Sequence, residues 1–564
     1  MKAIKITELV QWLLIGGIII FFIIPVITLI TAGLFEGQPL EGAARILWQS
    51  GWLAGFLNSV IHAGIAAALA TITAWLLAYG MHFSRLFQPI RQFSDLLFRL
   101  PMLLPTITYG FVLLYCFGKQ GLWTRILGFE LFDLYGSSGV ILGYFIYTLP
   151  TAYLLLYNGM DYLDQQYLVV SRLLGDSPIT SVLQNVLRPM QKLIGISFCQ
   201  TFFMAFTDFG IPTAVGGRKV FITTLLYEGF TGSIPDFQKG SLVALSMLIP
   251  SLFSVLLIRQ LQKLQQSFKQ RRKVPVVANL ARDSFLGLLF VLVGGSLLAM
   301  FSVMFIIPFV TAWPYEMIFT TENFRAFFAD DLLSNTLSNS LIVSLISAVV
   351  GMSIAYLAGI VTSFSRQNSI AAKGIDLFAT LTNSFPGMVL GVMFLLAFSG
   401  TTLHNTLSIL VIANIIHFFA TPYQMAKESF QKMDHSWEKT SQIMGDRWID
   451  LVWRIIIPNS RGTILEMMSY YFTNSMVTIS GLIFLVSART SVMTTKIKEL
   501  QHFGRFVDIF ILSLLILAIN CVALFAIKLT KKYWGKKKEV TLNQKQFHFP
   551  QILFKREMQK FSSK

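Results

Sequence analysis

The feature that most restricts the fold of this chain is a long run near its start without a single charged side chain. The run extends from Val10 to Phe35 and ends at Glu36. A helix that crosses the ~30 Å hydrocarbon core of a bilayer needs about 20 mostly apolar residues. A secretory signal has a shorter apolar run, of about 7–15 residues, before a small-residue cleavage site. Because this run is longer and further apolar runs follow, we expect a retained first transmembrane helix.

The same composition extends along the whole chain. Hydrophobic residues make up 54% of the 564 residues and charged residues only 13%, against roughly 45–50% and about 25% in an ordinary soluble domain. Apolar runs of spanning length predict an all-α polytopic membrane protein with about 12 transmembrane helices, divided between two halves. The expected spans are residues 10–33, 53–80, 96–117, 138–158, 192–215 and 240–261, then 285–312, 339–363, 377–399, 405–424, 463–487 and 507–528.

A basic connector, residues 263–283, separates the two sets of spans, and a second basic segment, residues 531–564, ends the chain. Cytoplasmic segments carry an excess of Lys and Arg, so both segments are expected in the cytoplasm, with an even number of spans before each. We therefore predict a first half (residues 1–262), a second half (residues 284–530) and two cytoplasmic termini. The basic tail could also bind nucleic acid, but after a transmembrane helix attraction to anionic lipid headgroups is the better interpretation.

The two halves match each other at one fixed offset. The match extends from the second span into the third and includes Pro and Gly as well as common apolar residues. The matching pairs are Asn58 with Asn339, Ser59 with Ser340, Pro105 with Pro386 and Gly110 with Gly391. Because each half has an even number of spans, the copies should have the same orientation, as a parallel repeat about a pseudo-two-fold axis along the membrane normal.

The sequence gives little support to an enzyme or a metalloprotein. Cys116, Cys199 and Cys521 are scattered through apolar segments, and the histidines form no HExxH pair. The chain contains no phosphate-binding GxxxxGK[ST] loop, no GxSxG sequence and no evident carboxylate pair in a pocket. We expect a non-catalytic subunit without a cofactor, which cannot hydrolyse ATP by itself.

Two polar loops, one in each half, lie between the fourth and fifth spans. They are too polar to cross the membrane, yet apolar residues recur in them at helical spacing, so short amphipathic helices along the cytoplasmic surface are expected. In residues 168–189 these are Ile179, Val182, Leu183 and Val186; in residues 438–458 they are Met444, Trp448, Leu451, Val452 and Ile455.

Both loops resemble the EAA loop of ABC-importer permeases, whose pattern is EAA, three residues, Gly, nine residues, Ile, one residue and Leu-Pro. In the second loop the spacing fits Gly445, Ile455 and Pro458, although Lys439-Thr440-Ser441 replaces EAA. In the first loop Val169-Val170-Ser171 precedes Gly175, and Pro189 comes one residue late. Glycine suits the turn because it tolerates positive φ, although either glycine could simply end a surface helix.

This resemblance implies a permease with two fused MetI-like domains in a bacterial cytoplasmic (inner) membrane. It implies that the loops couple the helices to separate ABC ATPase subunits, in two copies, and that an extracytoplasmic solute-binding protein delivers the solute. The implied coupling residues are Gly175, Asp176, Ser177, Pro189, Glu438, Gly445, Asp446 and Pro458.

Two further segments, Phe206 to Glu228 and Thr478 to Ile497, resemble the exits from the fifth spans in fused permeases for ferric iron, 2-aminoethylphosphonate and thiamine. The resemblance implies a small solute of that group without selecting one.

Asp208 is the main charged residue expected inside a span. Intramembrane ionisable residues often mark a pathway, so Asp208 could line the translocation path; alternatively it reaches the outer interface or caps the break at Gly210-Ile211-Pro212. Thr207, Asn474, Thr478 and Ser480 could also face the path, or bond between helices.

Pro105 and Pro386 should kink the two third spans, because proline removes a backbone hydrogen bond and clashes with the preceding turn. Such kinks could help a path to gate, or could serve packing alone.

Two other function classes remain possible on this reasoning. A twelve-span secondary carrier also has two parallel six-helix halves, but such carriers usually bury ionisable residues along their path. A membrane scaffold without transport activity is the third possibility.

Overall fold

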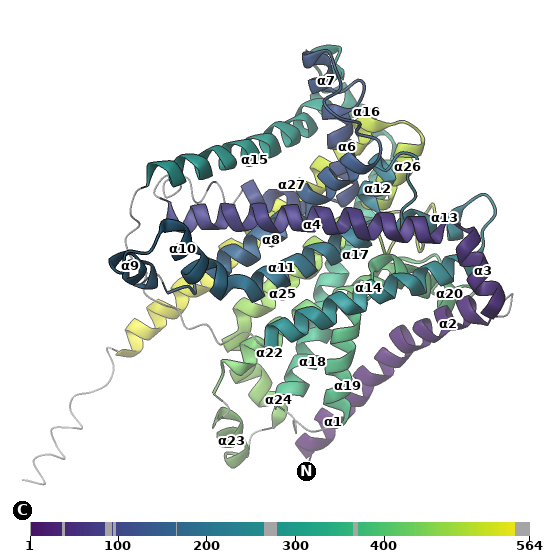
Figure 1. Ribbon diagram of the computed structural model, residues 1–564. Helices are drawn as coiled ribbons and strands as arrows, with labels where there is room; N and C mark the ends of the chain where they lie inside the picture. Colours follow the sequence, from purple (N-terminus) through teal and green to yellow (C-terminus); the bar gives the residue numbers. More distant parts are fainter. Residues whose placement is uncertain are drawn as a thin grey trace, which may run out of the picture.

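The computed structural model describes residues 2–35, 40–84, 93, 97–164, 166–263, 279–364, 370–434, 436–445 and 447–546. Most of the connector and the end of the basic tail lie outside these ranges. The described chain is helical apart from one antiparallel hairpin, in which β1 (Val310–Ala312) pairs with β2 (Glu316–Phe319). Figure 1 shows long helices crossing in a bundle. This bears out the prediction of a helical protein.

The first half consists of long helices joined by short ones. Its elements are α1 (Lys2–Ile18), a π-helical turn (Ile19–Ile23), α2 (Ile24–Leu34), α3 (Leu40–Gln49), α4 (Trp52–Phe83), a 3₁₀ turn (Leu100–Leu103), α6 (Thr106–Phe117), α7 (Leu122–Leu127), α8 (Ser137–Met160), α9 (Gln166–Leu173), α10 (Pro178–Val182), a π-helical turn (Leu183–Leu187), α11 (Arg188–Thr207), α12 (Gly210–Val215), α13 (Ile222–Thr231) and α14 (Phe237–Lys263).

The second half follows a similar order. Its helices are α15 (Leu280–Ile306), a 3₁₀ turn (Ile307–Phe309), α16 (Glu322–Ala329), α17 (Asp331–Ile346), a π-helical turn (Ser347–Gly351), α18 (Met352–Phe364), α19 (Ile370–Thr382), α20 (Gly387–Phe398), α21 (Leu407–His417), α22 (Ala420–Gln431), α23 (Ser436–Ile443), α24 (Trp448–Leu451), a π-helical turn (Val452–Ile456), α25 (Ile457–Val477), α26 (Met493–His502) and α27 (Phe506–Gln546).

Within the described residues, seven continuous helices are long and apolar enough to cross a membrane, and three bent helix pairs raise the number to ten. Every one of the ten overlaps a predicted span. The remaining two predicted spans, 192–215 and 463–487, correspond to α11 and α25, which do not pass the same test of length and apolarity. The structure thus supports a polytopic membrane protein, with seven to ten candidate spans by length and composition among the described residues.

The prediction of kinked third spans underestimated the distortion. The helical segments on either side of the break are bent by 114° before α6 and by 113° before α20. Pro105 and Pro386 stand immediately before α6 and α20 with ψ of 144° and 142°, so each proline starts a new helix instead of bending an existing one. Proline is well suited to this position because it lacks the N–H that a helix start leaves unpaired.

The fourth and fifth spans also differ from the prediction. The fourth span of the second half is split into α21 and α22, bent by 50°. The fifth spans end early, because α11 stops at Thr207 and α25 at Val477, and the chain then turns before the short helices α13 and α26. Apolar composition alone did not indicate these turns, since the residues on both sides of each turn remain apolar.

The first helix of each half packs against the other half. α1 and α2 contact α19 and α20, and the ring of Phe22 lies 5.3 Å from Phe378 and 5.1 Å from Phe385. In the same way α15 contacts α4 and α6, and Phe301 lies 5.9 Å from Tyr109. This exchange of first helices makes the two halves one packed body.

Equivalent residues of the repeat make equivalent hydrogen bonds. Asn58 donates to the carbonyl of Val220 (3.0 Å), and Ser59 accepts from the N–H of Ile222 (2.9 Å). In the second half the corresponding contacts join Asn339 to the carbonyl of Ser491 (3.0 Å) and Ser340 to the N–H of Met493 (2.7 Å). The Asn-Ser pair of each second span therefore holds the loop that follows the fifth span.

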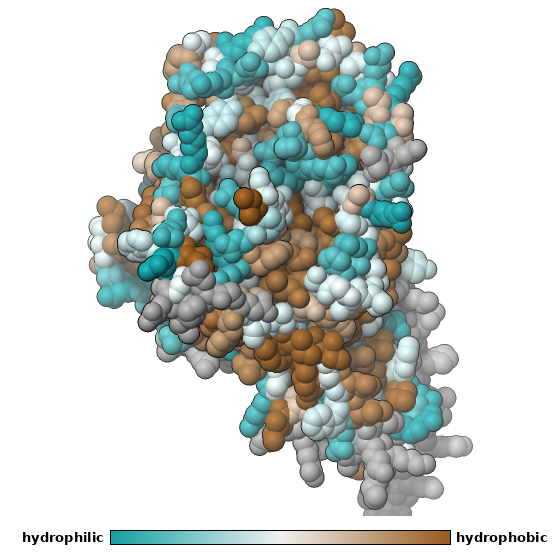
Figure 2. All heavy atoms as spheres, turned by 90° about the vertical axis from the view of Figure 1, so that its right-hand side faces the viewer, coloured by the Kyte–Doolittle hydropathy of each residue, from teal (hydrophilic) through white to brown (hydrophobic). Residues whose placement is uncertain are grey.

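The short helices gather at two ends of the bundle. In Figure 1, α9 and α10 lie at the left and α23 and α24 at the bottom, whereas α7 and α16 lie at the top and α26 and α13 toward the right. Figure 2 views the molecule from the side of α2, α3 and α13, and shows hydrophilic residues mainly in the upper part and a large hydrophobic area below. Exposed side chains such as Trp12, Ile20 and Ile27 on the first two helices match a surface that faces lipid.

The close contact between α20 and the turn after α25 gives a first test. A β-carbon added at Gly391 would lie 2.2 Å from the carbonyl oxygen of Gly481, which is backbone and cannot move aside cheaply. We expect Gly391→Ala to destabilise the protein by about 1–3 kcal/mol, as overpacking does, and to lower its melting temperature in detergent. Gly374→Ala, where nothing lies within 4 Å, is the control; equal melting temperatures for the two variants would contradict this packing.

Candidate functional site

The first polar loop forms a helix, a sharp turn and a second short helix. α9 ends at Leu173, and Gly175 follows with φ of +82°, a conformation that favours glycine. Asp176 accepts a hydrogen bond from the hydroxyl of Ser171 (2.6 Å), and the hydroxyl of Ser177 accepts from the N–H of Thr180 (3.2 Å) as the N-cap of α10. Pro189 lies in the first turn of α11.

The second polar loop has the same construction. α23 ends at Ile443, Gly445 has φ of +76°, and α24 begins at Trp448 after Arg447. Glu438 lies within α23, Asp446 falls outside the described residues, and Pro458 occupies the first turn of α25, as Pro189 does in α11. The turns at Gly175 and Gly445, one in each half, therefore both place their glycine at a similar positive φ.

The structure reveals two exposed apolar pairs that the sequence reasoning missed. Leu173 and Leu174 are 82% and 77% exposed, and Ile443 and Met444 are 86% and 74% exposed. Each pair lies directly before its glycine turn, so the two pairs occupy corresponding positions of the two loops. Apolar side chains exposed at corresponding places of two polar loops indicate a contact surface for another protein. Aligning the two loops on their glycines would have shown that an apolar pair precedes each turn, but not that these side chains are exposed.

The predicted amphipathic face of these loops was only partly right. Leu451 and Val452 are buried, whereas Met444 lies before the turn at Gly445 and so does not share a helix with them. In the first loop Val186 is buried but Ile179 is 74% exposed. The turn at Gly445 therefore divides what the periodicity treated as one helix in the second loop, whereas in the first loop all four predicted residues follow the turn at Gly175.

Asp208 follows the last residue of α11 and is buried. Its carboxylate accepts from the N–H of Ile211 at 2.9 Å, and Thr106 and the N–H of Gly210 also bond to it. The carboxylate thereby accepts hydrogen bonds from N–H groups that the start of α12 would leave unpaired. This is the cap of the break at Gly210-Ile211-Pro212 that the sequence analysis considered as one alternative.

The other candidate path residues cluster at the ends of the two fifth helices. Thr207 donates to the carbonyl of Phe203 (2.9 Å), and Asn474 to that of Tyr470 (2.7 Å), so each bonds within its own helix. Thr478 follows the end of α25, and Ser480 lies in the next turn, close to Gly387 at the start of α20. All four side chains are half-buried.

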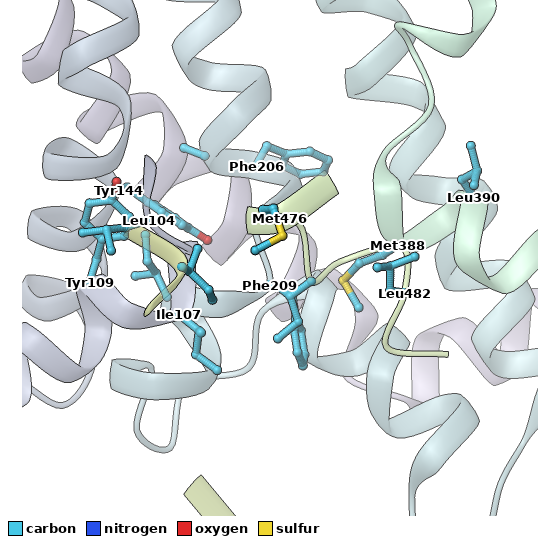
Figure 3. Packing of buried hydrophobic residues seen from close by; sticks show 14 of the residues in the cluster. Leu104, Ile107, Tyr109, Tyr144, Phe206, Phe209, Met388, Leu390, Met476 and Leu482 are labelled. Carbon is cyan, nitrogen blue, oxygen red and sulfur yellow. The ribbon is translucent and has the colours of Figure 1, made fainter. Parts of the chain in front are cut away.

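Apolar residues from both halves surround these polar positions. Figure 3 shows Phe206 and Phe209, from the end of α11 and the residues after it, near Met476 of α25, with Leu482 and Met388 beyond them. All five belong to one buried cluster. The ends of α11 and α25 therefore both contribute side chains to the buried core of the molecule.

Asp208 is not the only charged residue within the bundle of the described chain. Asp376 of α19 accepts hydrogen bonds from Lys427 (2.7 Å) and from the hydroxyl of Tyr423 (2.6 Å), both on α22. The sequence reasoning overlooked this group because the predicted third span of the second half began just after Asp376 and the predicted fourth span ended just before Lys427. Within the described residues, no three His, Cys, Asp or Glu side chains come together as metal ligands.

Comparison with known protein families shows which family this chain resembles. The sequence profile of a family described as binding-protein-dependent transport system inner membrane component matches residues 70–269 and 351–532. The chain belongs to this family. The starts of the two matches, residues 70 and 351, are separated by the same offset as Asn58 and Asn339 of the internal repeat, and each match includes one of the two polar loops.

Two curated relatives are similar over most of their length. The permease is 24% identical over 437 residues to a Haemophilus influenzae protein named "Putative ferric transport system permease protein FbpB 1", covering 74% of this chain and 68% of that one. It is 23% identical over 475 residues to the ferric transport system permease protein FbpB of Actinobacillus pleuropneumoniae, covering 80% and 67%. The resemblance to ABC-importer permeases of the ferric type is thereby confirmed.

The capping role of Asp208 can be tested by its removal. Asp208→Ala leaves the buried N–H of Ile211 without its acceptor, so we expect a loss of about 1–3 kcal/mol in unfolding free energy, measured as a lower melting temperature in detergent. Thr207→Val is the neighbouring control, because that hydroxyl bonds only to carbonyls of its own helix. A melting temperature for Asp208→Ala no lower than that of Thr207→Val would show that the cap is unimportant.

Proposed function

We propose that the permease forms the translocation path of an ATP-driven importer for ferric iron, with twelve membrane spans in two six-helix halves. A separate ATPase subunit contacts each polar loop, and an extracytoplasmic binding protein delivers the solute at the opposite end. Both termini and both polar loops lie in the cytoplasm. The loops are hereafter called the coupling loops, residues 168–189 and 438–458.

The duplicated coupling loop is the observation that carries this proposal. Two turns with glycines at φ of +82° and +76° each follow an exposed apolar pair. A permease without its own phosphate-binding loop needs an external source of energy. Two equivalent docking sites suit two copies of one ATPase, because nucleotide-driven closure of an ATPase pair would move both loops together.

Twelve spans follow if α11 and α25 cross the membrane with the ten candidates. They contain 20 and 21 residues, and at 1.5 Å per residue each is about 30 Å long, enough for the hydrocarbon core. Their polar residues lower their apolarity, and a helix that lines a path inside a bundle tolerates such residues better than one facing lipid. Thr207, Asn474, Thr478 and Ser480 are the path residues on this proposal, with Asp208 beside them.

Ferric iron is the proposed solute because both curated relatives carry ferric transport in their names. Neither name supports 2-aminoethylphosphonate or thiamine. The family match also gives no support to a secondary carrier, whose transport would stop when a proton gradient is dissipated and continue when ATP is depleted.

The coupling loops can be tested through their apolar pairs. We expect Leu173→Glu with Leu174→Glu, and separately Ile443→Glu with Met444→Glu, to reduce co-purification of the ATPase and to abolish uptake in proteoliposomes, because a carboxylate in an apolar contact costs several kcal/mol. Phe503→Glu, an exposed residue between α26 and α27 at the other end, is the control and should retain ATPase binding.

Membrane insertion and the melting temperature should be unchanged in both double variants, since these side chains already face solvent. ATPase binding and uptake at the level of Phe503→Glu would refute the proposed coupling surface.

A further inference from the structure

The two halves meet beyond the ends of α11 and α25 through two junctions. At the first, Tyr227 and Phe230 of α13 contact Phe484 of the second half, with ring centroids 6.1 Å and 5.8 Å apart. At the second, Gln501 of α26 donates to the carbonyl of Thr213 in α12, at 3.3 Å. Both junctions lie between a short helix of one half and the turn after the fifth helix of the other.

The two junctions are equivalent positions of the repeat. They are related by the same offset as Ile222 and Met493, which occupy equivalent places in the hydrogen bonds of the second spans. The matching pairs are Tyr227 with Lys498, Phe230 with Gln501, and Phe484 with Thr213. The first junction is therefore aromatic, and its equivalent is polar and carries a cation.

Lys498 is the unusual member of the polar junction. It is half-buried, and its ammonium donates to the side-chain oxygen of Gln501 at 3.0 Å. Within the described residues no carboxylate pairs with it, whereas its neighbour Lys496 pairs with Glu499 at 2.7 Å. Burial lowers the pKa of Lys498.

A cation removed from water without an opposite charge costs free energy. The aromatic residues of the first junction show that the same position can be filled without that cost. Exposed Arg218 and Arg489, which are equivalent to each other at the same offset, add positive charge to the two loops that form the junctions. Residues 478–504, which include the polar junction, carry Arg489, Lys496 and Lys498 against Glu499 alone, and this excess of positive charge favours a negatively charged ligand.

We propose that Lys498 and Gln501 recognise the anionic oxygens of the solute, carboxylate or phosphate in chemistry, as it passes between the two halves. Ammonium and amide groups together offer several donors to such oxygens. The inference rests on the proposed import function and refines it: iron reaches the path as a complex with an anion, and a bare cation or a cationic solute is disfavoured.

The first experiment measures protection of Lys498 in the purified complex of permease and ATPase. An amine-reactive reagent modifies lysines, and mass spectrometry follows the rate at Lys498 and at Lys119, an exposed lysine in the loop after α6. Ferric citrate, citrate alone and inorganic phosphate should slow modification of Lys498 and leave Lys119 unaffected, and thiamine should protect neither. Unchanged rates at Lys498 with all three anions would overturn the proposal.

The second experiment uses the kinetics of ferric citrate uptake to distinguish recognition of the anion by Lys498 from a purely structural role of this residue. Loss of a charge-assisted hydrogen bond should raise KM about tenfold or more in Lys498→Met, with kcat nearly unchanged, and Lys498→Arg should recover most of the affinity. Lys119→Met is the control. A lower kcat at unchanged KM in Lys498→Met, or an equal rise of KM in Lys498→Arg and Lys498→Met, would indicate a structural role and contradict recognition of the anion.

Failure of the proposed solute gives a different result from failure of this inference. If the wild type takes up 2-aminoethylphosphonate and no iron, and Lys498→Met raises the KM for the phosphonate, the ferric proposal fails and the anion site stands. If thiamine is the solute taken up and Lys498→Met transports it normally, the anion site is wrong.

Discussion

The structure depends on one constraint of the bilayer, that backbone groups released by a helix break in the hydrocarbon must find partners within the protein. This chain breaks its helices before α6 and α20 and after α11 and α25. Asp208 caps the start of α12, and Ser59 and Ser340 accept from the N–H groups of Ile222 and Met493. These partners come from the same segment at Asp208 and from the second spans at Ser59 and Ser340, so the interior of the bundle can hold irregular segments.

Much of the fold was predictable because it repeats. One fixed offset relates Asn58 and Ser59 to Asn339 and Ser340, and the structure shows the same bonds at both places. The breaks before α6 and α20 were not predictable in extent. A proline in an apolar run predicts disturbance, but a bend of 113° or 114° depends on which segment packs into it.

The candidate site was predictable to a similar degree. Spacing identified Gly175 and Gly445, and both have positive φ, since a turn there is local and glycine is the residue that permits it. The exposure of Leu173 or Ile443 and the half-buried position of Lys498 are products of tertiary packing. Apolar residues are usually buried and lysines usually exposed, so the sequence alone argued for the opposite in each case.

The central claim, that both coupling loops face the cytoplasm, is tested most directly by thiol labelling. Single cysteines at Leu174, Met444 and Lys119 would be placed in a Cys521→Ser background, because Cys116 and Cys199 are buried. With a membrane-impermeant reagent, Leu174→Cys and Met444→Cys should react only in inside-out vesicles, and Lys119→Cys only in right-side-out vesicles. Labelling of the two loops from opposite sides of the membrane would contradict the account.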